Sequence, residues 1–256
     1  MNTTTRAVLF DLDGTLADTL ADLAAAVNQA LAQVGCPTHP LASYRYFVGD
    51  GARNLIQRVL PADRLNLIEP VLALMRAHYD AHCFDQTRLY PGIAELVDEL
   101  RRRGLKLAVL SNKPDEFTKR MIAYYFGHAL PGGPRGACAE SRSIVAAISV
   151  ATNATDPFPP RSRTAAAVGP FDAVRGQFPN IPLKPDPTVA LQLAGALDVP
   201  PAQWLYLGDT NTDMQTACAA GMIPVGVLWG FRDRTELVAN GARHLLARPN
   251  DLLALL

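Results

Sequence analysis

The sequence predicts an α/β protein with a three-layer core around a parallel sheet and a small helical cap domain inserted after the first strand. Two observations predict the core. Short apolar runs alternate with helical patterns along the chain, and small polar clusters follow three of those runs. A third observation predicts the cap, because the mostly helical stretch between the first two apolar runs is too long for one crossover connection.

The N-terminal half shows the alternation most clearly. Ala7–Phe10 is short, continuous and apolar, which predicts a buried strand. A helix is expected from about Thr19 to Val34, where apolar residues recur every three or four positions. A second helix begins at Pro91-Gly92 and ends at Gly104, where glycine favours termination. The strand Leu105–Leu110 then ends in polar residues, and a helix follows to about Phe126.

The C-terminal half continues the pattern. Trp204–Leu207 and Ile223–Leu228 read as strands on either side of a helix, and another strand is expected near Phe171–Val174. We predict an α/β core over residues 1–16 and 89–256 and a helical cap over residues 17–88. Within the core, residues 132–170 are rich in Gly, Pro, Ser, Ala and Arg and are predicted to form an atypical loop insertion.

Composition excludes several classes of protein. Lys+Arg and Asp+Glu are both 24, so the chain lacks the basic excess typical of nucleic-acid-binding proteins. The chain is 49% hydrophobic and 19% charged, which is too apolar for a disordered protein. No apolar run reaches the length of a membrane span, and the first one is too short for a signal-peptide core. With scattered cysteines, these features predict a cytoplasmic protein that binds neither nucleic acid nor membrane.

Three carboxylates predict a metal site. Asp11 and Asp13 follow the first strand, and Asp209 follows a later one, so all three are expected at one edge of the sheet. Such an anionic patch is costly without a cation, and oxygen ligands of this kind suit Mg²⁺. Asp213 lies four residues after Asp209 and shares its face if a helix begins there. We expect Asp213 to orient a ligand or a bound water.

Two further clusters predict phosphate binding. Ser111 and Asn112 stand between a strand and a helix, where a hydroxyl and backbone N–H groups hold phosphate oxygens. Lys184 lies before a proline and offers an ammonium group that would offset the charge of a phosphate and of Asp11. Each cluster alone is ordinary turn or surface chemistry. Their convergence on the carboxyl ends of parallel strands favours one site.

These motifs resemble the four ordered motifs of the haloacid dehalogenase-like hydrolases. The likeness rests on Asp11-Leu-Asp-Gly-Thr15, on Ser111-Asn112, on Lys184 and on Gly208-Asp-x-x-x-Asp213. The helical insert after the first motif resembles the small cap of the phosphoglycolate-phosphatase-like subgroup. The resemblance covers nearly the whole chain outside residues 132–170. The 73 positions from Ser111 to Lys184 are more than we expect in such relatives.

The resemblance implies a Rossmann-like core and a covalent mechanism. In that mechanism Asp11 is expected to be the nucleophile that forms an aspartyl-phosphate. Asp13 protonates the leaving oxygen and then deprotonates the hydrolytic water. Mg²⁺ is held by Asp11, Asp209 and the backbone carbonyl of Asp13.

The remaining site residues are assigned to the substrate. The resemblance implies that Ser111 and Lys184 act in catalysis by binding the transferring phosphoryl group, with Asn112 beside them. Arg53, in the predicted cap, is a candidate contact for a substrate carboxylate. The expected partner is a small phosphorylated metabolite, and the chain is expected to be a monomer or a homodimer.

The implied activity is that of a phosphoric monoester hydrolase. We expect a Mg²⁺-dependent phosphatase of small phosphomonoesters, with 2-phosphoglycolate as the favoured substrate. The alternatives are another sugar-phosphate phosphatase, a phosphosugar mutase, and a non-catalytic phosphate-binding or interaction protein. Release of free phosphate separates the phosphatases from a mutase, and binding without turnover would support the non-catalytic protein.

Overall fold

A computed structural model describes residues 4–127 and 168–256. Within these residues, six strands form one parallel sheet in the order β5-β4-β1-β6-β7-β8, and two short strands, β2 and β3, pair separately. The strands are β1 (Ala7–Phe10), β2 (Ala17–Asp18), β3 (Arg88–Leu89), β4 (Lys106–Pro114), β5 (Ala173–Gln177), β6 (Trp204–Gly208), β7 (Ile223–Val227) and β8 (His244–Leu246).

Helices fill the intervals between the strands. The α-helices described are α1 (Leu20–Gln33), α2 (Leu41–Phe47), α3 (Ala52–Val59), α4 (Ile68–His82), α5 (Ile93–Arg102), α6 (Asp115–Phe126), α8 (Thr188–Ala196), α9 (Asn211–Ala219) and α10 (Arg234–Ala239). Three 3-10 helices complete the described set: η1 (Ala62–Leu67), η2 (Pro201–Gln203) and η3 (Pro249–Leu255).

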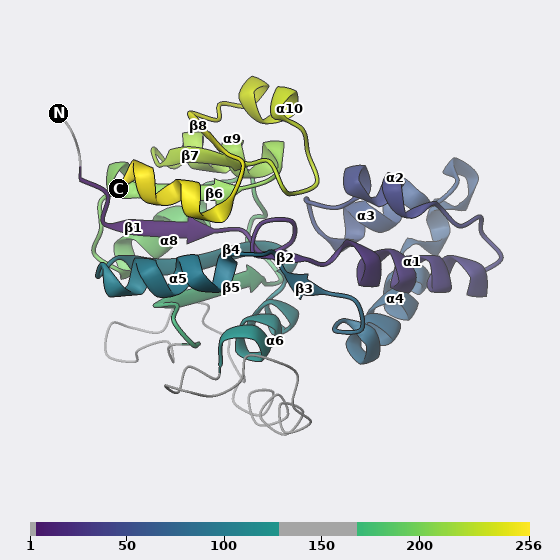
Figure 1. Ribbon diagram of the computed structural model, residues 1–256. Coiled ribbons are helices and arrows are strands. Elements are labelled where there is room, and N and C mark those ends of the chain that lie inside the picture. The colour runs from purple at the N-terminus through teal and green to yellow at the C-terminus, as the bar shows by residue number, and fades with distance from the viewer. Residues whose placement is uncertain (1–3, 128–167) are drawn as a thin grey trace.

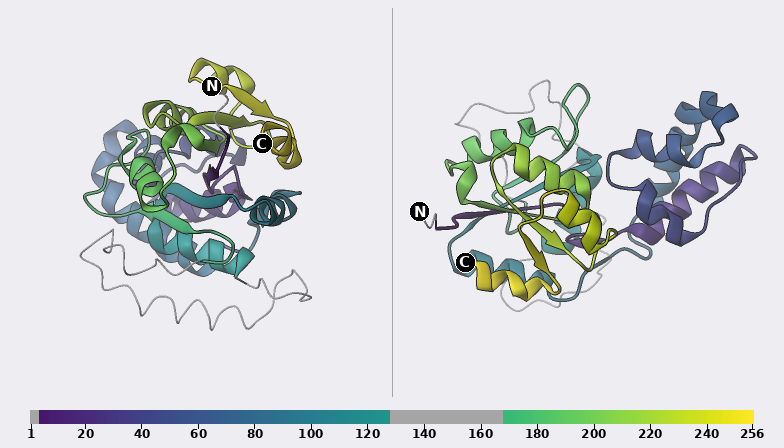
Figure 2. Two further views of the ribbon diagram at one scale, coloured as in Figure 1. Left: turned by 90° about the vertical axis from the view of Figure 1, so that its left-hand side faces the viewer. Right: turned by 90° about the horizontal axis from the view of Figure 1, so that it is seen from above.

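The central sheet separates two apolar layers, as the sequence predicted. Val8 and Phe10 on β1 belong to a core cluster shared with α5 and α6, whereas Ala7 and Leu9 belong to a second cluster with α8 and α9. Figures 1 and 2 show these helices on opposite sides of the sheet. Because both faces are covered, the strand residues are apolar on both sides and read as continuous runs.

The helices α1 to α4 form a cap beyond the carboxyl ends of the strands (Figure 1). The antiparallel β2–β3 pair, with Ala17 opposite Leu89, joins the two chain segments that lead into and out of the cap. Buried Asp22 on α1 fixes the returning segment, since it accepts hydrogen bonds from the Thr87 backbone N–H and hydroxyl, both at 2.8 Å. We therefore propose this pair as the boundary between core and cap, at the residues predicted from the sequence.

Two strands differ from their predicted bounds by more than one residue. β5 was expected near Phe171–Val174 but spans Ala173–Gln177, and β4 is longer than predicted. The sequence placed the end of the second buried strand at Leu110, but β4 continues to Pro114. The pairing with β5 shifts register between Leu110 and Pro114, and Pro114 then pairs with Gln177. Ser111, Asn112 and Lys113 are consequently buried rather than exposed in a turn.

Two predictions concern other parts of the chain. The predicted loop insertion over residues 132–170 lies, up to residue 167, outside the described residues. Across the described ranges, none of the helices has both the length and the apolar character that a membrane crossing requires.

Candidate active site

Asp11 directly follows the carboxyl end of β1 and lies at the centre of the site. Its side chain is buried, and its Oδ1 lies 2.9 Å from Nζ of Lys184. Burial raises the pKa of Asp11 to about 7, although the neighbouring Lys184 ammonium opposes that shift. The nucleophile predicted from the sequence is therefore buried beside the predicted cation.

Lys184 is held from several sides despite its distance from Asp11 in sequence. Asn112 accepts a hydrogen bond from the Lys184 backbone N–H at 2.9 Å and donates one to its carbonyl at 3.1 Å. Lys184 Nζ also lies 2.6 Å from Oδ1 of Asp213 and donates to the Leu110 carbonyl at 3.2 Å. Burial disfavours the charged ammonium, but Asp11 and Asp213 outweigh it and raise the pKa of Lys184 well above its ordinary value.

Three carboxylates form a buried acidic centre that differs from the predicted set, because Asp213 takes the place of the Asp13 carboxylate. Asp11, Asp209 and Asp213 each offer an oxygen atom, and these atoms lie within 4.8 Å of one another. Asp213 reaches the group because α9 begins at Asn211, so that its carboxylate accepts bonds from the Thr210 backbone N–H (3.1 Å) and hydroxyl (2.7 Å). The Asp13 carboxylate is not part of this group, since its Oδ1 pairs with Nζ of Lys113 at 2.9 Å.

The donor set fits a divalent cation. Burial, followed by the charges of Asp213 and Asp11, raises the pKa of Asp209 well above its ordinary value. Asp11 Oδ1, although close to Lys184, accepts no aligned hydrogen bond from the described residues. Crowded carboxylates of this kind are costly by themselves, and a hard cation with oxygen ligands relieves the cost.

Two glycines enclose the Asp209 carboxylate. A Cβ at Gly14 would lie 2.2 Å from Asp209 Oδ2, and one at Gly230 would lie 2.2 Å from Asp209 Cβ and 2.5 Å from the Gly14 carbonyl oxygen. The neighbouring Phe231 N–H donates to Asp209 Oδ2 at 2.7 Å. Close backbone approach therefore fixes this carboxylate, and no larger residue fits at either glycine.

We expect Gly230→Ala to destabilise the protein by about 1–3 kcal/mol, because the added methyl group overpacks a buried site. Urea denaturation measures the change. The matched control is Gly195→Ala in α8, where a Cβ meets nothing within 4 Å. Alanine in a helix is favoured over glycine by roughly 1 kcal/mol, so this control should be at least as stable as wild type. Equal stability of Gly230→Ala and wild type would contradict the enclosed geometry.

A second network surrounds Asp13. Its Oδ1 lies 2.9 Å from Nζ of Lys113 and accepts a hydrogen bond from the Thr19 hydroxyl at 2.7 Å. Lys113 also donates to the Tyr79 hydroxyl on α4 at 3.0 Å. Burial disfavours the charged Lys113, but the interactions with Asp13 and Tyr79 together outweigh it and raise the pKa of Lys113. The predicted acid–base residue is thus linked through Lys113 to a cap helix.

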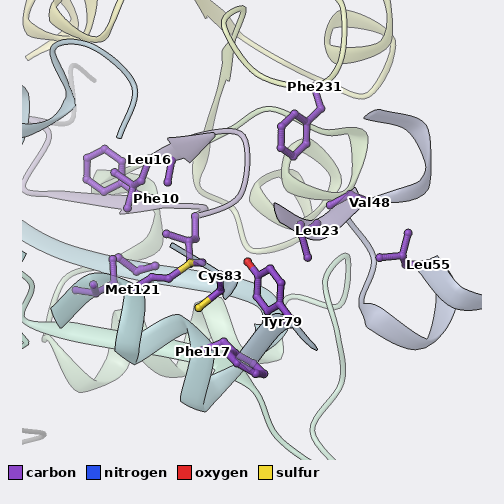
Figure 3. Packing of buried hydrophobic residues seen from close by; sticks show 14 of the residues in the cluster. Phe10, Leu16, Leu23, Val48, Leu55, Tyr79, Cys83, Phe117, Met121 and Phe231 are labelled. Atoms are coloured by element: carbon purple, nitrogen blue, oxygen red, sulfur yellow. The ribbon is translucent and has the colours of Figure 1, made fainter. Parts of the chain in front are cut away.

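A pocket between core and cap is lined by four of the eight predicted site residues, whereas Lys184, Asp209, Asp213 and Arg53 are not among its lining residues. From the core it is lined by Asp11, Asp13, Ser111 and Asn112. Its other wall is largely apolar, and Figure 3 shows part of that wall at close range. The apolar lining residues labelled there are Leu23, Val48, Leu55 and Phe117, with the ring of Tyr79 beside them.

The predicted cap contact Arg53 is not among the lining residues. Its side chain is exposed and forms an ion pair with Glu69 of α4. The arginine that lines the pocket is Arg76, also on α4. The motifs did not point to Arg76, because an exposed helix arginine carries no signal in sequence.

Sequence reasoning also missed Lys113, Tyr79 and Thr19. Lys113 directly follows Ser111-Asn112 in the sequence. The available signal was its proximity to that motif, but only the continuation of β4 buries it beside Asp13. Tyr79 lies near the end of α4 and belongs to its apolar pattern, so nothing distinguished it from a core residue.

Comparisons with known proteins give matches over both halves of the chain. A family model described as haloacid dehalogenase-like hydrolase matches residues 8–125, and a second, HAD-hydrolase-like, matches residues 183–253. A phosphoglycolate phosphatase of Pseudomonas putida is 30% identical, over 98% of this chain and 78% of that protein. One from Aquifex aeolicus is 28% identical, over 98% of this chain and 96% of that protein.

Solved structures give the same result for the fold. The structure of a candidate phosphoglycolate phosphatase from Lactobacillus delbrueckii subsp. bulgaricus superposes with a TM-score of 0.76 at 26% identity. The match covers 97% of each chain. The similarity therefore includes both the parallel sheet and the helices that cap it.

Proposed function

Because the chain belongs to the haloacid dehalogenase-like hydrolases, in the group similar to phosphoglycolate phosphatases, we propose that it hydrolyses small phosphomonoesters with Mg²⁺ and prefers 2-phosphoglycolate. It is a phosphoric monoester hydrolase in this proposal. The observation that carries it is that Asp11, Asp13 and Ser111 line a single pocket between core and cap. The cytoplasmic location and the oligomeric state stay predictions from the sequence.

Asp11 performs the first step. One of its carboxylate oxygens attacks the phosphorus atom, and the bond from phosphorus to the leaving oxygen breaks, which gives an aspartyl-phosphate. Lys184, 2.9 Å from Asp11, offsets the negative charge that the phosphate brings to the carboxylates. The Ser111 hydroxyl, at the end of β4, binds a phosphoryl oxygen in the same pocket.

Asp13 moves the protons in both steps. It donates a proton to the leaving oxygen in the first step and takes one from the attacking water in the second. The ion pair with Lys113 and the hydrogen bond from Thr19 hold its carboxylate in place. Hydrolysis of the aspartyl-phosphate then returns Asp11 and releases free phosphate.

The Mg²⁺ site is proposed at Asp11, Asp209 and the Asp13 backbone carbonyl, the ligand set that the family resemblance implies. When bound, the ion neutralises charge on the phosphate. Asp213 lies in the same group of carboxylates but is paired with Lys184 at 2.6 Å, which supports a positioning role for it. The crowding of the three buried carboxylates is the property of this chain that supports the assignment.

The function is tested by phosphate release from a panel of phosphomonoesters, with Mg²⁺ and with a chelator. The panel contains 2-phosphoglycolate, ethyl phosphate and several sugar phosphates. We expect release that requires Mg²⁺ and is fastest for 2-phosphoglycolate. Conversion of a sugar phosphate to its isomer, without release of free phosphate, would show that the protein is a mutase and would contradict the proposal. Binding of these phosphates without any turnover, in a folded preparation, would show that the protein is a non-catalytic phosphate-binding protein.

A further inference from the structure

We infer that Arg76 of α4 binds a carboxylate on the leaving group of the substrate and thereby directs the enzyme to phosphorylated hydroxy acids. The inference rests on the proposed function, because it assigns the specificity of the same site. Arg76 lines the pocket that contains Asp11 and Asp13, and its side chain is otherwise exposed.

Arg76 is a cation of the pocket that has no carboxylate partner among the described residues. Lys113 is paired with Asp13, and Lys184 is paired with Asp11 and Asp213. Among residues 4–127 and 168–256, by contrast, the Arg76 guanidinium makes no hydrogen bond and no ion pair. A cation without a partner at a substrate pocket provides a ready site for an anionic group of the substrate.

The position of Arg76 on α4 places it near the leaving group. Residues three apart on a helix share a face, so Arg76 and Tyr79 lie one above the other on the side lining the pocket. The Tyr79 hydroxyl lies 3.0 Å from Lys113 Nζ, which lies 2.9 Å from Asp13. Since Asp13 is the proposed acid for the leaving oxygen, Arg76 stands one helical turn from the network that contacts it.

The chemistry of the cap wall favours a short acid over a sugar. Apart from Arg76 and Tyr79, the lining residues from the described cap helices and their connections have apolar side chains or none. They are Leu23, Val48, Gly49, Gly51, Ala52, Leu55 and Met75. A sugar would bring several hydroxyl groups that need polar partners, whereas a carboxylate needs one guanidinium that binds it through two parallel hydrogen bonds.

The test compares two substrates that differ in the carboxylate alone. Ethyl phosphate has the carbon chain of 2-phosphoglycolate with a methyl group in place of the carboxylate. Arg76→Met should lower kcat/KM for 2-phosphoglycolate by about 10- to 100-fold and change that for ethyl phosphate by less than about threefold. Methionine suits a helix as well as arginine does, and the position is exposed, so we expect the fold to persist.

Three further variants serve as controls for this test. Arg76→Lys keeps the charge and should recover part of the lost activity on 2-phosphoglycolate. Arg64→Met removes an exposed cap arginine that hydrogen-bonds the Val34 carbonyl outside the pocket, and should leave both substrates unaffected. Arg53→Met tests the contact predicted from the sequence. A loss confined to 2-phosphoglycolate in Arg53→Met, with none in Arg76→Met, would overturn the assignment of Arg76.

Binding provides a measurement that does not depend on turnover. Calorimetric titration of 2-phosphoglycolate into Asp11→Asn protein, with and without Arg76→Met, should show about 10-fold weaker binding in the double variant. Ethyl phosphate should bind both variants equally. Equal loss for the two ligands, or no loss, overturns the role of Arg76. An absence of phosphate release from every substrate by wild type overturns the proposed function instead, and the titration still decides the role of Arg76.

Discussion

Asp11→Asn should lower kcat by at least about three orders of magnitude, because an amide oxygen cannot replace the carboxylate nucleophile. The fold should persist, since asparagine has the same size and Lys184 keeps its partner Asp213 at 2.6 Å. Removing one of three crowded buried carboxylates also relieves repulsion in the metal-free protein. Phosphate release in the presence of Mg²⁺ and urea denaturation in chelator measure the two effects.

The matched control for this variant is Asp63→Asn in η1. Asp63 is exposed and lies outside the pocket lining, so its substitution should change neither turnover nor stability measurably. Turnover by Asp11→Asn with an unchanged Mg²⁺ requirement would show that another group attacks the phosphorus atom.

Asp13→Asn should separate the two chemical steps. With 2-phosphoglycolate, the loss of the general acid should slow turnover by about 10²- to 10⁴-fold. With 4-nitrophenyl phosphate, whose leaving group needs no proton, the first step should remain fast while the second stays slow. We therefore expect a burst of one equivalent of nitrophenol followed by slow release, measured by stopped-flow absorbance. A uniform slowing with no burst would contradict the two roles of Asp13.

The Asp13→Asn variant should also be less stable than wild type. It leaves the buried ammonium of Lys113 without its carboxylate partner, which typically costs about 3–5 kcal/mol. The double variant Asp13→Asn with Lys113→Met removes both charges and should regain much of that stability. If the single variant does not fold, the same burst is expected from the double variant.

Much of the core could be predicted because apolar strands are short and continuous in a sheet covered on both faces. Ala7–Phe10 was predicted with the bounds of β1, and Trp204–Leu207 was within one residue of β6. The peripheral β8 was missed, because its sequence His244–Leu246 is short and only partly apolar. The extent of β4 was missed because its polar end is buried by tertiary contacts that no local pattern reveals.

Some residues of the candidate site could be predicted from the sequence and others could not. Asp11, Asp209 and Lys184 were predictable, since polar residues at strand ends of a parallel sheet converge at one edge. Lys113 and Tyr79 were not, because their contact joins β4 to a cap helix across a large separation in sequence. The position of Arg76 likewise depends on how the cap packs over the core. Arg53 is also an arginine of a cap helix, but it pairs with Glu69 and does not line the pocket.

The most direct test of the central claim, covalent phosphoryl transfer to Asp11, is to trap the intermediate. Asp13→Asn protein, or its double variant with Lys113→Met, is mixed with Mg²⁺ and 4-nitrophenyl phosphate, quenched in acid and analysed by peptide mass spectrometry. We predict one phosphoryl group per chain on the peptide that contains Asp11, and none when Asp11→Asn is added. An unmodified Asp11 peptide, in a preparation whose wild-type parent releases phosphate, would contradict the covalent mechanism.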